Sequence, residues 1–130
     1  MTTLDTDILV SLLKGDVDAV DKVRTIQESG EQISTTMITA YELTKGANLS
    51  SKVDDNIAKV RDALSRLSIL DLSLGSVEEA SRIYKDLRSR GRPIGEFDVL
   101  IAGIVNFNDE RLVTRDEHFK AIRGMKLVAW

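Results

Sequence analysis

The 130-residue sequence contains no cysteine, one proline, one histidine and one tryptophan. Without cysteine, the chain can form neither a disulfide framework nor a thiolate zinc site, and it has no cysteine nucleophile. Its apolar runs are only a few residues long, far short of the ~18 residues that a membrane-spanning helix needs. The first residues, Met1–Asp5, show neither the basic nor the apolar region of a signal peptide. We therefore expect a protein of the reducing cytoplasm without a membrane segment.

The composition is that of an ordinary globular chain. Hydrophobic residues make up 42% and charged residues 30%, which is typical of a folded domain and not of a disordered segment. The length suits one domain over residues 1–130, since single domains usually extend over ~100–200 residues. The 18 Lys and Arg residues stand against 21 Asp and Glu residues, for a net charge of −3. Overall charge alone therefore disfavours nucleic acid as a partner, unless charges of each sign are segregated.

Short apolar runs alternate with longer stretches of helical period along the chain. The predicted strands are Thr2–Asp5, Gln32–Thr35, Ser68–Leu72, Leu112–Thr114 and Leu127–Trp130. The predicted helices are Ile8–Leu13, Asp16–Ser29, Met37–Ala47, Val53–Arg66, Ser76–Ser89, Gly95–Asn106 and Asp116–Ile122. This alternation predicts a three-layer α/β/α fold with a mainly parallel sheet of about five strands. In such sheets, sites form beyond the carboxyl ends of the strands.

Two acidic residues stand at or just after the first predicted strand. Asp5 lies at the tip of that strand. Asp7 points the same way if the chain stays extended, because strand side chains repeat every two residues. The alternative is that one of them, Asp7 above all, caps the helix that follows.

Asp98 stands in the first turn of a strongly apolar predicted helix. Ile101, Ala102 and Val105 follow at three, four and seven residues, which places Asp98 on an apolar face. A buried carboxylate must be protonated, paired or bound to a cation. The alternative is that the helix dipole and the free amides of the first turn satisfy it. Glu96 lies about 200° away around the helix and is the weaker candidate.

Asp116 and Glu42 complete a set of four acids near strand ends. Taken singly, Asp116 fits a helix cap and Glu42 fits a surface pair with Lys45. Taken with Asp5 and Asp98, they predict a shared site. Converged carboxylates repel one another unless a cation holds them, and oxygen ligands select Mg²⁺ or Mn²⁺. Such a metal site typically serves phosphate chemistry.

The order and spacing of these residues resemble the motifs of the PIN-domain family. The segments that carry the resemblance are Leu4–Leu9, Ile38–Leu43, Phe97–Ala102 and Val113–Asp116 with Phe119. Over Thr2–Trp130 the chain looks most like the VapC toxins of bacterial and archaeal toxin–antitoxin pairs. Asp7 stands where many members have Asn, and Glu96 matches an acid that only some members have.

The resemblance implies a Mg²⁺- or Mn²⁺-dependent endoribonuclease. Its catalytic and metal-binding quartet falls on Asp5, Glu42, Asp98 and Asp116. Thr114 matches the polar residue before the last acid, and Thr114, Asp7 and Glu96 are secondary ligand candidates. The resemblance also implies cleavage that leaves a 5′-phosphate and a 3′-hydroxyl, a short VapB-like antitoxin as partner, and a homodimer.

Basic residues near the predicted site are the candidates for contacts with RNA phosphates. They are Arg88, Arg90, Arg92 and Arg115. Arg82 and Lys85 fit a solvated helix face instead. Aromatic residues amount to only 5% of the chain, which predicts little base recognition by stacking. His118, the one histidine, is expected at the surface without a catalytic role.

Two other functions remain open from the residues. A haloacid-dehalogenase-like phosphatase also has Asp-x-Asp at a strand end, as in Asp5–Asp7, but usually has a longer strand before it and a later catalytic lysine. A non-catalytic phosphoacceptor receiver domain needs an Asp at its third strand, where Asp71 stands, but also a lysine that the last strand lacks. A ribonuclease assay with and without Mg²⁺, beside phospho-donor labelling of Asp71, separates the three.

Overall fold

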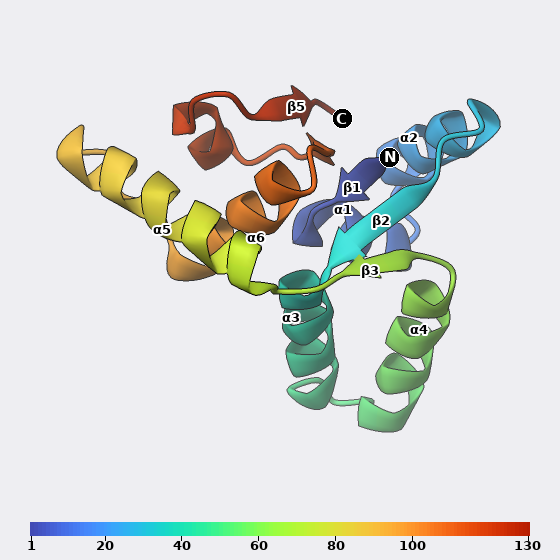
Figure 1. The fold of residues 1–130 in the computed structure, drawn as a ribbon. Helices are drawn as coiled ribbons and strands as arrows, with labels where there is room; N and C mark the ends of the chain where they lie inside the picture. Colours follow the sequence, from blue (N-terminus) through green and yellow to red (C-terminus); the bar gives the residue numbers. More distant parts are fainter.

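Strands and helices alternate from end to end in the computed structural model, which describes residues 1–130 (Figure 1). The strands are β1 (Thr2–Leu4), β2 (Ile33–Thr36), β3 (Ser68–Leu70), β4 (Arg111–Val113) and β5 (Lys126–Val128). The helices are α1 (Thr6–Leu13), α2 (Val17–Glu28), α3 (Met37–Asn48), α4 (Val53–Ser65), α5 (Leu74–Ser89), α6 (Glu96–Phe107) and the 3-10 helix η1 (Glu117–Ala121). Each predicted element is present, and no end differs by more than two residues.

All strands run parallel in one sheet of order β3-β2-β1-β4-β5. The central strand is β1, in which Thr3 pairs with Ser34 of β2 on one side and Leu112 of β4 on the other. Because the strands are parallel, their carboxyl ends meet at the same edge of the sheet. The predicted α/β/α fold with a five-stranded parallel sheet is confirmed.

Two apolar cores lie on opposite faces of this sheet. Leu4 and Val113, which are paired in register, join the core formed with α1, α2, α3 and α4. Leu112 faces the other way and joins the core formed with α5, α6 and η1. This alternation follows from the two-residue period of a strand. Figure 1 shows α5 and α6 side by side on their face of the sheet.

A glycine allows α5 and α6 to pack closely. A Cβ atom at Gly103 of α6 would lie 2.6 Å from the Ala80 Cβ and 2.7 Å from the Ser76 carbonyl oxygen of α5. Only a residue without a side chain therefore fits the present separation of the two helices. The contact fixes the position of α6, whose first turn carries Asp98.

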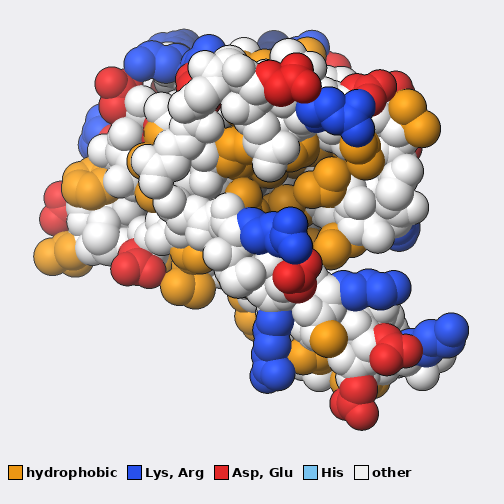
Figure 2. Space-filling view, turned by 90° about the vertical axis from the view of Figure 1, so that its right-hand side faces the viewer, with side chains coloured by type: hydrophobic (Ala, Val, Ile, Leu, Met, Phe, Trp, Pro, Cys, Tyr) orange, Lys and Arg blue, Asp and Glu red, His pale blue; other side chains and the backbone are white.

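The side of the molecule formed by α2 and α4 is hollowed, with hydrophobic side chains at the bottom of the hollow (Figure 2). The hollow measures ≈ 500 Å³, and its lining includes Leu9, Leu12, Val23, Ile33 and Leu67. Glu31, Asp62 and Arg66 also line it. None of the helices has the length and apolar character needed to cross a membrane.

Candidate metal and nuclease site

Asp5 follows the central strand and is the N-cap of α1. Its Oδ1 accepts a hydrogen bond from the Ile8 amide at 3.2 Å, and its Oδ2 accepts one from the Thr114 hydroxyl. The side chain is only 3% exposed. The chain does not stay extended as far as Asp7, because the Asp5 cap starts the helix at Thr6. Asp5, and not Asp7, is therefore the capping residue, and Asp7 lies exposed in the first helical turn.

Burial raises the pKa of Asp5 to about 6. The hydrogen bonds from Thr114 and Ile8 lower the pKa, but burial outweighs them, and the negative charge of Asp7 acts in the same direction as burial. A carboxylate in this position lacks a compensating positive charge among its protein neighbours. A cation bound beside Asp5 would supply that charge and favour the ionised form.

Thr114 links the tips of β1 and β4. Its hydroxyl donates to Asp5 and accepts a hydrogen bond from the Asp116 amide at 3.0 Å. Asp116 in turn caps η1, since its Oδ1 accepts from the His118 amide at 2.9 Å. The two aspartates are thus held in fixed relation through one threonine hydroxyl. The helix-cap interpretation of Asp116 is correct and does not exclude Asp116 from the site.

Asp98 lies half-buried in the first turn of α6. Its pKa is raised, first by burial and then by the negative charges of Asp116, Glu42 and Asp7, while His118 acts in the opposite direction. These carboxylates are therefore close enough to feel one another. The electrostatic coupling is the repulsion that the sequence predicted for a converged set.

Glu42 enters the site from α3. Its Oε1 accepts a hydrogen bond from the Thr6 hydroxyl at 2.7 Å, and Thr6 also contacts the Thr39 hydroxyl at 3.1 Å. The alternative of a surface pair with Lys45 is not formed, because Glu42 points towards the start of α1. Thr6 therefore holds the glutamate from the first turn of α1, a role that the sequence did not reveal.

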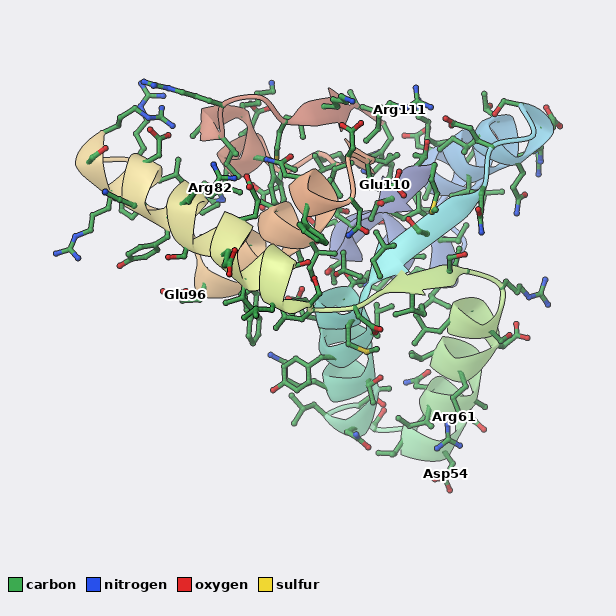
Figure 3. The ribbon with its side chains drawn as sticks, viewed as in Figure 1. Asp54, Arg61, Arg82, Glu96, Glu110 and Arg111 are labelled. Atoms are coloured by element: carbon green, nitrogen blue, oxygen red, sulfur yellow. The ribbon has the colours of Figure 1, made fainter.

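These acids line one small cleft at the carboxyl edge of the sheet. The cleft measures ≈ 80 Å³, and its lining consists of Asp5, Thr6, Asp7, Glu42, Asp98, Ile101, Asp116 and Phe119. All four acids of the predicted quartet are in this set, together with Asp7. Glu96 is not, and Figure 3 shows it on the outer side of the start of α6. The expectation that Glu96 and Asp98 face different directions is confirmed.

A histidine stands beside the acids. A carboxylate oxygen of Asp98, a carboxylate oxygen of Asp116 and a ring nitrogen of His118 lie within 4.8 Å of one another. The His118 Nδ1 atom lies 2.9 Å from Asp116 Oδ1, although the imidazole is 67% exposed. His118 is at the surface, as expected, but it also contacts a carboxylate of the site. The carboxylate oxygens of this set are ligands of the kind that a divalent metal ion takes in proteins.

The four predicted phosphate contacts differ in their availability. Arg88 and Arg92 are exposed near the end of α5. Arg90 is 23% exposed, and its guanidinium binds Asp86 and donates to the Ala121 carbonyl at 2.6 Å. The hydrogen bond from Arg90 to Asp86 also holds the pKa of Asp86 below its ordinary value. Arg90 thus ties α5 to η1.

Arg115 is held by the C-terminal residue, Trp130. Its guanidinium carbon lies 3.4 Å from the centroid of the Trp130 ring, and its Nε donates to the Trp130 carbonyl at 3.0 Å. Its Nη2 atom lies 3.6 Å from an Asp18 carboxylate oxygen. The side chain of Arg115 therefore already has a stacking partner and two acceptors.

The chain matches proteins of known family over nearly its whole length. The model of the PIN domain matches residues 2–125. The tRNA(fMet)-specific endonuclease VapC of Shigella flexneri is 28% identical over 98% of this chain and 96% of its own. Ribonuclease VapC2 of Rickettsia felis is 30% identical over the same shares. Among solved structures, VapBC2 of Rickettsia felis, bound to a promoter DNA fragment, has a TM-score of 0.92 at 28% identity, covering 99% of this chain and 98% of that one.

A second complex, the DNA-bound VapBC of Salmonella typhimurium, has a TM-score of 0.90 at 27% identity and covers 100% of this chain and 99% of that one. The chain therefore belongs to the PIN-domain family, and within it to the VapC ribonucleases. The resemblance stated from the sequence is confirmed, and this family replaces the phosphatase and receiver-domain alternatives.

Proposed function

We propose that this chain is a divalent-metal-dependent endoribonuclease and the toxin of a VapBC-type pair. The observation that carries the proposal is the meeting of Asp5, Glu42, Asp98 and Asp116 in one cleft. They come from four segments that are far apart in the sequence. The raised pKa values of Asp5 and Asp98 fit a site that awaits positive charge.

In this proposal Asp5, Asp98 and Asp116 hold Mg²⁺ or Mn²⁺, and Glu42 binds the same ion directly or through water. A bound divalent ion supplies an acidified water and neutralises charge on the phosphate. The protein groups around it fix the ligands, which is the usual task of outer hydrogen bonds at metal sites. Thr114 positions Asp5, Thr6 positions Glu42, and the His118 amide positions Asp116.

The RNA backbone approaches the cleft along a basic border in this proposal. Arg88 and Arg92 are exposed and free to contact phosphates, while Arg90 holds the end of α5 against Ala121. Arg115 reaches a phosphate only by leaving Trp130 or Asp18. We therefore assign the main phosphate contacts to Arg88 and Arg92.

A VapB-like antitoxin is the proposed protein partner. The solved relatives are VapBC complexes, and the hollow between α2 and α4 exposes apolar side chains of the kind that mark protein interfaces (Figure 2). A second copy of the chain is a further proposed partner. Leu74, Val77 and Phe107 are exposed and lie where α5 begins and α6 ends, which offers an apolar surface for it.

The test is cleavage of RNA by the purified chain with Mg²⁺, with Mn²⁺ and with EDTA. Asp98→Asn keeps the size of the side chain and removes the charge, so we expect it to abolish cleavage and leave the fold intact. Glu96→Gln, two residues away and outside the cleft, is the matched control and retains cleavage. Cleavage by Asp98→Asn at the normal rate in Mg²⁺ contradicts the assignment.

A further inference from the structure

Two exposed aromatic rings meet between α3 and α6, the helices that bring Glu42 and Asp98 into the acidic cleft. Tyr41 of α3 and Phe97 of α6 pack edge to face, with their centroids 5.6 Å apart and their planes at 82°. Tyr41 is 53% exposed and Phe97 37% exposed, and neither belongs to the two apolar cores. Each ring directly precedes an acid that lines the cleft, Glu42 and Asp98 respectively.

A lysine completes this cluster. The Lys45 Nζ atom lies 5.4 Å from the centroid of the Tyr41 ring and 5.4 Å from that of Phe97. Lys45 forms no ion pair within the chain, because Glu42 is bound by Thr6 instead. Its ammonium group is therefore held near the rings by cation–π attraction and keeps its charge available for an anion.

The cluster has the chemistry of a site for a nucleotide. An aromatic ring binds an unstacked base through its π-face, and a neighbouring ammonium group attracts the phosphate that follows. An acidic peptide would use the lysine and leave the two rings uncovered, whereas an aliphatic segment would leave the charge unused. The ligand that uses all three groups is both aromatic and anionic.

We propose that Tyr41, Phe97 and Lys45 form a subsite that stacks one unpaired base of the RNA next to the cleaved bond. The proposal rests on the proposed ribonuclease function, which supplies the RNA and places the scissile phosphate at the carboxylates. It revises the expectation from composition that stacking contributes little. Few aromatic residues are present, but two of them are exposed and directly precede acids of the cleft.

The first experiment measures binding of a short single-stranded RNA to chains that carry Asp98→Asn, so that the RNA stays intact. Stacking of a base on an aromatic ring predicts that Tyr41→Ala weakens binding by about 5- to 150-fold. Tyr41→Phe retains the ring and is expected to bind within about 2-fold of the parent. Tyr84→Ala removes an exposed tyrosine of α5 and is the control without effect.

The second experiment identifies the stacked base. An RNA series carries one abasic nucleotide at successive positions around the cleaved bond, and cleavage is measured with the wild-type chain and with Tyr41→Ala. At one position, the abasic nucleotide is expected to reduce cleavage by the wild type. At that same position it should cause no further loss of cleavage with Tyr41→Ala, because both changes remove the same contact. Independent, additive losses at every position overturn the proposal.

The outcomes separate this inference from the proposed function. If the wild type cleaves no RNA, the ribonuclease proposal fails first. If the wild type cleaves RNA and Tyr41→Ala has unchanged binding and abasic sensitivity, only the stacking proposal fails. Light scattering on the same variants tests whether the rings instead contact a second copy of the chain. If Tyr41→Ala dissociates an oligomer and leaves RNA binding unchanged, the rings belong to a contact between two copies and the subsite proposal is overturned.

Discussion

Replacing Asp5 by asparagine is expected to stabilise the metal-free protein at pH 7 while it abolishes RNA cleavage. Asp5 is almost fully buried, and its pKa is about 6 in the folded chain against an ordinary value of 3.8. Below pH 3.8 the carboxyl is neutral in both states, so its ionisation costs no stability. Between pH 3.8 and 6 the unfolded chain releases the proton first, and stability falls as the pH rises.

The size of the effect follows from the shift. A rise in the pKa of Asp5 from 3.8 to about 6 corresponds to about 3 kcal/mol of stability lost by pH 7. Asparagine avoids this cost because it has no charge, and its side-chain oxygen can still accept from the Ile8 amide. Its amide group no longer accepts from Thr114, which costs about 1 kcal/mol. The net gain is about 2 kcal/mol, or a rise in melting temperature of roughly 5–10 °C for a chain of this size.

The assay is thermal unfolding of both proteins in EDTA at pH 7 and at pH 5. The difference between wild type and Asp5→Asn is expected to shrink at pH 5, where the wild-type carboxyl is largely protonated. Mg²⁺ should raise the melting temperature of the wild type more than that of Asp5→Asn, because bound metal stabilises the folded state. Asp71→Asn is the matched control, an exposed acid just beyond β3 at the same edge of the sheet, and should change nothing.

A lower melting temperature for Asp5→Asn than for the wild type in EDTA at pH 7 would refute the reasoning. The buried carboxylate would then contribute to stability through its hydrogen bonds more than it costs through burial.

Three further predictions concern the packing, the link between the strand tips and the basic border. Gly103→Ala should destabilise the fold by about 1–3 kcal/mol, because its Cβ would meet Ser76 and Ala80. The measurement is the midpoint of unfolding in urea, which should fall, and an unchanged midpoint contradicts the close packing. Thr114→Val should reduce cleavage strongly while Thr114→Ser retains it, since the hydroxyl of Thr114, and not its methyl group, donates to Asp5 Oδ2. Equal cleavage rates for both variants would show that this hydrogen bond does not matter for activity. Charge reversal of Arg88 and Arg92 should weaken RNA binding and reduce its salt dependence by about one unit of slope per lost contact. Reversal of Arg82 on the same helix serves as the control.

The sequence predicted the order of the elements because apolar periods differ clearly between strand and helix along this chain. It also predicted that Asp5 and Asp116 share an edge, since both follow parallel strands. The start of α1 was misplaced because Asp5 and Asp7 have the same capping chemistry. Only the geometry of the Ile8 amide distinguishes them.

Contacts between distant segments were not predictable from one sequence. Arg90 was counted with the phosphate contacts, yet its carbonyl partner, Ala121, is 31 residues away and carries no sequence signal. The aromatic pair joins residues 41 and 97 through the packing of α3 on α6. The composition gives the number of aromatic residues and not their exposure, and so it could not show that Tyr41 and Phe97 are both exposed and in contact.

Asp5 and Asp116 each begin a helix as well as line the cleft. One oxygen of each side chain accepts the hydrogen bond that caps the helix. The negative charge of each side chain is the part that the proposed metal site requires. Exchange of one carboxylate oxygen for an amide nitrogen removes the second function and spares the first. Mutation of either residue to asparagine is therefore expected to abolish RNA cleavage without unfolding the chain, so that its outer surfaces stay available to a partner. Alanine removes both functions at once, so an alanine scan of this site would report damage to the helices as if it were loss of catalysis.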